Sequence, residues 1–165
     1  MKKTIFLAAA LALAGCASSH YNTLKFKPEP KAGIAVLPLE NYTESPMAGI
    51  KAASMCAGIL AARGVTVADR FSGAQERPIG ETELKKNLAD LAAANLAYTL
   101  TGSVNEWKYK AGLDGEPAVS VTLKLFDNRT GLQVWSAVAS KTGYSRQSTG
   151  VLAQKLLDKA LSEIK

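Results

Sequence analysis

Few residues of this 165-residue chain could take part in catalysis. The only histidine, His20, precedes the predicted domain, so we expect neither a histidine-dependent nucleophile nor a histidine-based zinc site inside it. Asp114 and Glu116 lie close together, and paired carboxylates can perform acid–base chemistry. Gly112, Gly115 and Pro117 surround them, however, which is more typical of a solvated turn between strands. We therefore predict that the protein is not an enzyme and needs no metal or cofactor.

The same acidic loop could instead bind a ligand. Asp114 and Glu116 present negative charge from a mostly basic chain, and such a loop can attract a cationic ligand through long-range charge. On a single monomer the attraction would be weak. If the loop were repeated around an oligomer, the fields of the subunits would add to a strong one.

Cys16 ends a segment that resembles the lipobox of bacterial lipoproteins. Lys2 and Lys3 are followed by an apolar stretch over residues 5–13, and small residues directly precede the cysteine. We predict that residues 1–15 are removed and that the Cys16 sulfur carries lipid. The apolar stretch is too short to span a bilayer, so attachment must come from acyl chains. No aspartate follows at the second mature position, which resembles lipoproteins sorted to the outer membrane, facing the periplasm.

The basic charge of the chain does not require a nucleic-acid partner. The formal net charge is +6, and it becomes +4 when Lys2 and Lys3 leave with the signal. An exported protein rarely meets nucleic acid, whereas anionic lipid headgroups or solubility explain the excess. With Cys16 lipidated, Cys56 has no partner for an internal disulfide. It lies in an apolar helical stretch, so we predict a buried thiol.

The elements predicted from hydrophobic periodicity form one domain. Residues 16–32 contain Pro28 and Pro30 and are predicted to be a tether after the lipidated cysteine; residues 33–165 form a single α/β domain. The first helix is expected to begin with Ser45 as N-cap and to end at Gly64. The order βαβαβββα predicts a mixed sheet of about five strands with helices packed on it. The predicted strands cover residues 34–39, 65–67, 97–110, 118–127 and 132–142, with a turn at 128–131, and the later helices cover 82–94 and 148–163. Alternation places Val119, Val121, Leu123 and Leu125 on one face of their strand. The residues expected to face the core from the two later helices are Leu84, Leu88, Leu91 and Ala92, and Ala153, Leu157, Ala160 and Leu161.

The aromatic residues suggest both a core and a membrane contact. Trp107 and Trp135 lie on neighbouring strands, where core packing and an interface both remain open. Tyr144 lies in a polar junction between Lys141 and Arg146. An aromatic among basic residues is typical of a membrane interface, where the cations would meet anionic headgroups. A capping contact on the last helix is an equally good interpretation of Tyr144.

Several segments together resemble a known family. Residues 106–119 (EWKYKAGLDGEPAV), followed by Val121-Thr122-Leu123, closely resemble the lipoprotein family of Pel exopolysaccharide export. The likeness continues in order through residues 133–137, 143–146 and 153–157, and covers nearly all of 33–160. The opening segment 34–43 (IAVLPLENYT) is shared more loosely with TolB-type amino-terminal domains.

The resemblance implies a function for this chain. It implies an outer-membrane lipoprotein that forms a large ring of identical subunits beneath an export porin and guides a cationic polysaccharide toward it, in biofilm matrix formation. Asp114 and Glu116 would line the polymer-facing side. Tyr144 replaces a tryptophan that the family often places toward the membrane. Alanine-rich helix surfaces would allow close subunit approach, although core packing explains them as well: Ala52, Ala53, Ala57, Ala61 and Ala62.

Two alternatives remain open from the sequence. One is a monomeric or small-oligomer regulatory lipoprotein that reaches a cell-envelope synthase through residues 17–32. The other is an enzyme acting on glycan through Asp114 and Glu116. The moderate length of the tether favours the ring over the regulator, since crossing the periplasm usually requires a longer arm.

Overall fold

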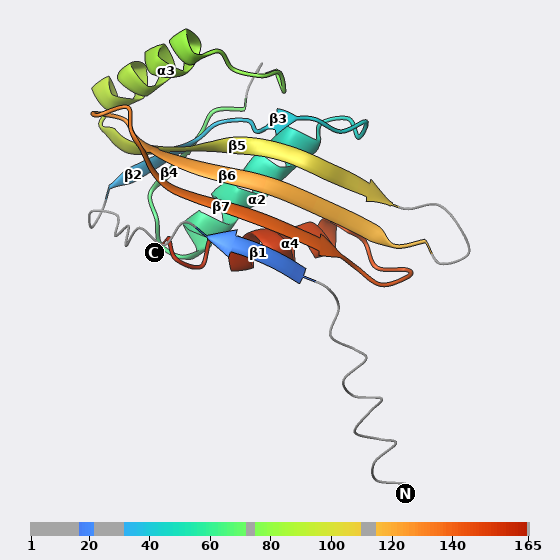
Figure 1. Cartoon of the computed structure of the whole chain (residues 1–165). Coiled ribbons are helices and arrows are strands. Elements are labelled where there is room, and N and C mark those ends of the chain that lie inside the picture. Colours follow the sequence, from blue (N-terminus) through green and yellow to red (C-terminus); the bar gives the residue numbers. More distant parts are fainter. Residues whose placement is uncertain (1–16, 22–31, 72–74, 110–114, 165) are drawn as a thin grey trace, which may run out of the picture.

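The computed structural model describes residues 17–21, 32–71, 75–109 and 115–164, with side chains from residue 32 onward. The predicted order βαβαβββα is confirmed from β2 to α4, and β1 and β3 are two strands that periodicity did not predict (Figure 1). The elements are β1 (Ala17–Tyr21), β2 (Gly33–Val36), β3 (Glu40–Asn41), α2 (Ala48–Ala62), β4 (Val67–Asp69), α3 (Glu81–Ala93), β5 (Leu96–Tyr109), β6 (Pro117–Asp127), β7 (Gln133–Thr142) and α4 (Thr149–Ala160).

The sheet is mixed, as predicted. Its strand order is β1-β7-β6-β5-β2-β4, and the short β3 runs beside β5. Strand β2 pairs in parallel with β4 and β5, because helices α2 and α3 carry the chain back across the sheet between these strands. Strands β5, β6 and β7 are joined by short connections and pair antiparallel. The long antiparallel half of the sheet therefore has free ends at which loops can meet.

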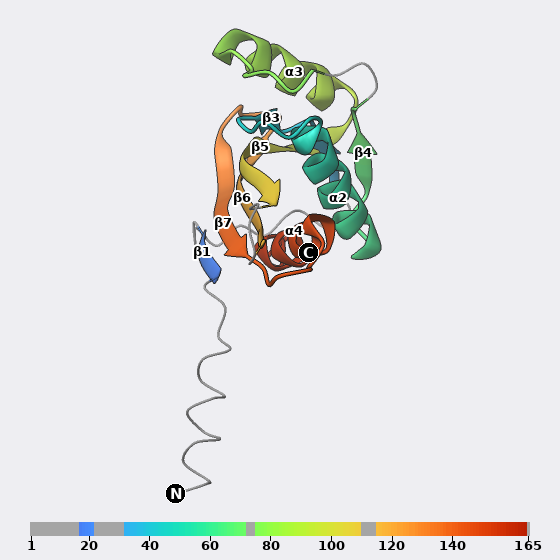
Figure 2. The ribbon, with the colours of Figure 1, turned by 90° about the vertical axis from the view of Figure 1, so that its right-hand side faces the viewer.

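The two faces of the sheet are covered differently. Ile34 and Val36 of β2 belong to the core under α2 and α4, whereas Ala35 and Leu37 pack with Leu91 of α3. Alternate residues of a strand point to opposite faces, so α3 covers the opposite face from α2 and α4. Figure 2 shows α2 and α4 lying together, with α3 apart from them.

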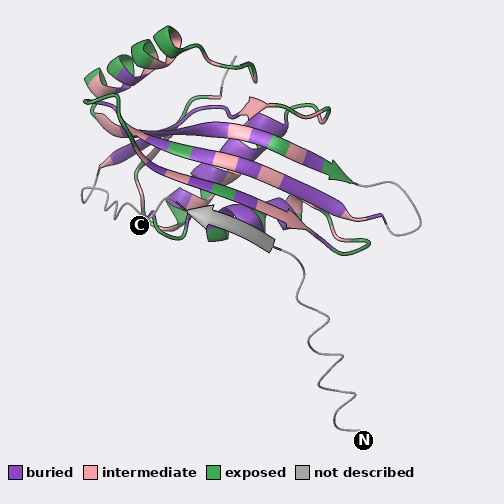
Figure 3. Ribbon diagram, in the orientation of Figure 1, coloured by how far each residue is buried: buried purple, intermediate pink, exposed green. Residues whose placement is uncertain are grey.

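Strands β6 and β7 bury alternate residues, in agreement with the alternation predicted for them. Trp107 and Trp135 both lie in the core, at 8% and 1% exposure, which answers the question that the sequence left open. Burying a large apolar side chain of this kind contributes about 1.5–3 kcal/mol. The alternation of buried and exposed residues along these strands is visible in Figure 3. The buried residues include Val119, Val121, Leu123, Leu125, Ala137 and Ala139.

Helix α2 begins later than predicted, and the assignment of Ser45 as N-cap was wrong. The N-cap is Met47, whose φ is 59°. Ser45 is held in the preceding loop instead: its N–H donates to the Thr43 hydroxyl at 3.1 Å, and its carbonyl accepts from the Asn41 amide at 2.9 Å. The predicted end is confirmed, with Gly64 at φ 83° just after the helix. A capping signal depends on tertiary partners as well as on residue type.

The start of α2 is capped from a distant loop by Glu76. Met47 makes no side-chain capping bond. The Ile50 N–H donates to Glu76 Oε1 at 2.7 Å, and the Asn41 amide donates to Glu76 Oε2 at 3.0 Å. The carboxylate thus accepts from one of the N–H groups that the first turn of a helix leaves unpaired, where the helix dipole also favours negative charge.

Replacing Glu76 with alanine is expected to destabilise the fold by about 1–2 kcal/mol, because the Ile50 N–H loses its acceptor and the Asn41 amide loses one of its two acceptors. Urea unfolding followed by circular dichroism would measure the lower midpoint. Glu44→Ala removes an exposed acid a few residues before the same helix and is the matched control. Equal unfolding midpoints for the two variants would show that Glu76 does not cap α2.

The buried residues of the helices agree with the predicted ones in most positions. In α3, Leu88 and Leu91 are buried as expected, whereas Leu84 and Ala92 are half-buried. Cys56 of α2 is fully buried and unpaired, as predicted, and burial raises the pKa of its thiol to about 12. The residues of the last helical segment predicted to face inward are all buried: Ala153, Leu157, Ala160 and Leu161.

Candidate functional site

The predicted functional residues that the structure describes lie at one end of the sheet. Tyr109, at the end of β5, pairs with Pro117, at the start of β6. The Gly143 N–H, just after β7, donates to the Pro117 carbonyl at 2.8 Å. The end of β5, the start of β6 and the beginning of the β7–α4 connection therefore lie side by side, at the right-hand end of the sheet in Figure 1. We call this region the loop end of the sheet.

The loop end is closely packed. A Cβ at Gly143 would lie 2.8 Å from Pro117 Cγ and 2.5 Å from Gln147 Oε1, so a larger residue there would have to displace the Gln147 side chain and the Pro117 ring. Gln147 Oε1 accepts from the Tyr144 N–H at 3.2 Å, which closes the turn before α4. The Tyr109 hydroxyl accepts from the Arg146 N–H at 3.2 Å. These contacts hold the β7–α4 turn against the base of the β5–β6 connection.

The predicted site residues are distributed around this end. Tyr144 is 57% exposed and Arg146 is exposed, with a backbone φ of 69°. Lys141 is half-buried, on the same face of β7 as Ala139 and Ala137, because alternate residues share a face. Glu116 is half-buried beside Pro117.

Asp114 and Cys16 lie outside the described residues. The structure thus brings together, at the loop end of the sheet, Glu116 and the residues that the sequence assigned separately to lipid: Lys141, Tyr144 and Arg146. The role of Tyr109 in joining the loops was not predicted, since nothing in the sequence indicates which backbone group a strand-end tyrosine will contact.

Strand β1 begins at this region. Its register pairs Ala17 with Lys141 and Tyr21 with Ala137, antiparallel to β7. Residue 17 therefore enters the sheet at the loop end. Five residues of the segment predicted as a tether are thus an edge strand, which periodicity over so short a stretch did not indicate. The remainder, residues 22–31, lies outside the described part of the chain.

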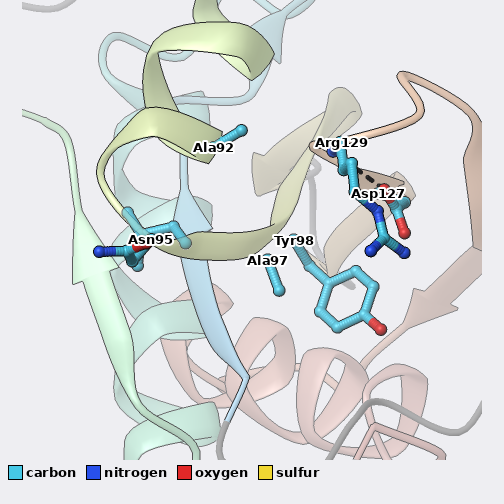
Figure 4. A pocket seen from close by; sticks show the side chains of 7 residues that line it. Ala92, Asn95, Ala97, Tyr98, Asp127 and Arg129 are labelled. Carbon is cyan, nitrogen blue, oxygen red and sulfur yellow. Dashed lines mark hydrogen bonds between the residues drawn. The ribbon is translucent and has the colours of Figure 1, made fainter.

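A cleft of about 290 Å³ lies at the opposite end of the sheet, where the β6–β7 turn approaches the end of α3 (Figure 4). Asn95, Tyr98, Asp127 and Arg129 line it. The Asp127 carboxylate accepts from the backbone N–H groups of Thr130 and Arg129, both at 2.9 Å, and these bonds lower its pKa. The carboxylate therefore closes the turn and is not arranged as a proton donor.

Two further properties can be stated for the described ranges. Within them, no group of three or more histidine, cysteine, aspartate or glutamate side chains could hold a metal ion. In the same part of the chain, no helix is both long enough and apolar enough to cross a membrane.

No protein-family model and no curated protein matches the chain. Solved structures do. Lipoprotein GNA1162 from Neisseria meningitidis has the same fold, with a TM-score of 0.57 and 22% identity over 80% of this chain and 96% of that one. The PelC dodecamer from Paraburkholderia phytofirmans is closer, with a TM-score of 0.75 and 35% identity over 90% of this chain and 98% of that one. A variant of the same dodecamer gives 0.76 and 34% over 90% and 97%.

These matches first define the class, a single-domain α/β fold that a bacterial lipoprotein also adopts. The identity to the Paraburkholderia proteins, which extends over nine-tenths of the chain, is sufficient to assign the family. The chain belongs to the PelC family.

Proposed function

We propose that the protein is a noncatalytic lipoprotein of the outer membrane that assembles into a ring of identical subunits and assists the export of a cationic exopolysaccharide. The observation that carries the proposal is the 34–35% identity, over 90% of the chain, to PelC proteins that are dodecamers. A ring requires head-to-tail contacts between two different surfaces of each subunit, related by a rotation that closes. The ring would lie at the periplasmic face, beneath an export porin.

The position of β1 supports a particular orientation on the membrane. Cys16 immediately precedes Ala17, which pairs with Lys141. One extended residue spans only about 3.4 Å, so a lipid on Cys16 would hold the loop end close to the bilayer. Tyr144 and Arg146 are exposed at this end and suit the headgroup region, where an aromatic ring and cations are both favoured. The loop end would therefore face the membrane.

The same orientation gives the acids a place in export. Glu116 lies at the loop end, so the β5–β6 connection would stand near the opening of the ring that faces the porin. Asp114 and Glu116 of every subunit would then combine into one negative field that attracts the cationic polymer. The net positive charge of the chain would be segregated from this field, toward lipid or between subunits.

Neutralising both acids, in Asp114→Asn with Glu116→Gln, is expected to reduce exported polymer at least about fivefold, because several kT of attraction at the opening would be lost. The measurement is extracellular polymer per amount of membrane-bound protein, in cells that contain only the variant.

The control for this variant is Glu81→Gln with Asp90→Asn. It makes the same charge change on α3, where both acids form exposed ion pairs, with Lys85 and Lys86. Such pairs contribute only about 0–1 kcal/mol each, so the control should fold and export normally. Undiminished export by the Asp114 and Glu116 variant would contradict a role of the acids in guiding polymer.

The assembly itself is tested by the native mass of the full mature protein, purified from membranes in detergent. A discrete species of many subunits in native mass spectrometry is expected. A monomer in detergent and in lipid nanodiscs would contradict the ring and would favour the regulatory lipoprotein that acts on a cell-envelope synthase.

A further inference from the structure

Helix α2 lacks the polar outer face that a surface helix usually has. Its only charged residue is Lys51, in the first turn. By contrast, α3 carries five charged residues: Glu81, Glu83, Lys85, Lys86 and Asp90. A helix that is apolar or small on all sides is normally buried, so α2 is composed like an interior helix although one side of it faces outward. The exposed residues of that side are Lys51, Ser54, Gly58, Ala61 and Ala62.

The structure shows which of the α2 alanines are buried and which are exposed, a distinction that the sequence did not give. Ala52, Ala53 and Ala57 are buried against the sheet, so packing within the subunit explains them. Ala61 and Ala62 are exposed at the end of the helix, where such packing does not.

Gly58 is the most informative residue of this face. It lies in the middle of α2, is exposed, and has no atom within 4 Å of where a Cβ would stand. Glycine at such a position destabilises a helix by roughly 0.5–1 kcal/mol relative to alanine. Nothing within the subunit requires a residue without a side chain at this position. A second surface that approached the helix backbone closely from outside would require one.

An apolar groove of about 350 Å³ runs beside Gly58, between α2 and α4. Met55 and Ile59 line it from α2, and Gln154 lines it from α4. Val151, which is 44% exposed, follows the same face of α4 one turn earlier. The groove therefore has an apolar wall on α2, next to a flat strip of small residues, and faces the polar side chains of Gln154 and Asp158 on α4, with exposed Val151 one turn away.

The charges at the end of the groove are already paired. The Arg63 guanidinium donates to the Asp158 carbonyl and carboxylate, both at 2.6 Å, and to the Leu161 carbonyl at the end of α4. Covering this end would therefore bury Arg63 and Asp158 as a hydrogen-bonded pair, which costs less than burying either charge alone.

We infer that the groove between α2 and α4, with Gly58 at its centre, is a contact surface for a second copy of this chain. This rests on the assembly proposed above: the PelC relatives are dodecamers, so copies of such a chain do cover part of one another's surface. In a head-to-tail ring this groove supplies one of the two different surfaces of each subunit, and the neighbour's complementary surface lies elsewhere on the protein.

The test compares Gly58→Ala and Gly58→Arg with the wild-type full mature protein in detergent, by native mass spectrometry and light scattering over a dilution series. Gly58→Arg should remain folded, since the site is open within the subunit, and should run as a monomer or a much smaller species. Gly58→Ala raises the helix propensity of α2. A weaker assembly of this variant could therefore not be attributed to a less stable helix. Its assembly should nevertheless dissociate at about tenfold higher concentration, because the added methyl overfills the contact.

Ala89→Arg is the matched control, since it adds the same side chain at an exposed position of α3. It should assemble like the wild type. If folded Gly58→Arg assembles like the wild type, the groove is not a contact surface, although the ring itself stands. If the wild type never assembles, both the ring and this inference are overturned.

Discussion

Changing Cys16 to alanine is expected to release the protein from the membrane fraction and to abolish polymer export. The proposed anchor is the lipid on Cys16, whose buried methylenes contribute about 0.8 kcal/mol each. In the described residues no helix can span a bilayer in its place. The contacts of Tyr144 and Arg146 with headgroups would be weak and sensitive to salt. The measurement is the distribution of the protein between membrane and soluble fractions after a high-salt wash, together with secreted polymer.

Cys56→Ala is the control for this variant, since Cys56 is the other cysteine of the chain. It is fully buried, and burial raises the pKa of its thiol to about 12, so the reactive thiolate is scarce near neutral pH. The Cys56 variant should stay attached and continue to export. Retention of the Cys16 variant in salt-washed membranes would refute lipidation as the anchor.

The largest loss of stability is expected from Gly102→Ala. Gly102 lies in β5 with a φ of 149°, and a Cβ there would come within 1.9 Å of the Thr122 carbonyl oxygen and 3.0 Å of Leu123 Cα. Both neighbours are backbone atoms of β6, which cannot move aside without breaking the strand pairing. We expect a loss of more than about 3 kcal/mol, from steric overlap together with backbone strain. The melting temperature should fall by at least about 6 °C.

Gly131→Ala separates the two causes. Gly131 also has a positive φ, 70°, but nothing lies within 4 Å of its would-be Cβ. Its replacement should cost only about 1–2 kcal/mol, from strain alone. Thermal melts at matched protein concentration measure both variants. If the melting temperature of Gly102→Ala equals or exceeds that of Gly131→Ala, the β6 backbone can shift to accommodate the added methyl group.

The predicted elements were accurate where periodicity and local chemistry agree. The face of Val119, Val121 and Leu123 is buried as its alternation indicated, because a half-covered strand must place every second residue inward. The turn before Gly131 and the end of α2 at Gly64 depend on positive φ values, which glycine adopts without strain. These features are decided by neighbours in the sequence.

The errors occurred where a distant residue competes with a local one. Ser45 has the right chemistry for an N-cap, yet Asn41 holds its carbonyl and Glu76 caps the helix. Strand β1 is defined by its pairing with β7, more than a hundred residues further along the chain. Neither contact has a periodic signal, because each depends on how separate elements are brought together by the fold.

Local sequence pattern was enough to predict the main elements from β2 to α4, most of their buried residues, a lipidation signal at Cys16 and the resemblance to the PelC family. It did not indicate that Glu116, Lys141, Tyr144 and Arg146 share one end of the sheet, where β1 also begins; that became visible in the folded chain. Only the tertiary structure distinguished the buried alanines of α2 from the exposed strip around Gly58. The physical reason is the same in each case: local pattern sets which face of an element is apolar, whereas packing of the whole chain decides what that face meets.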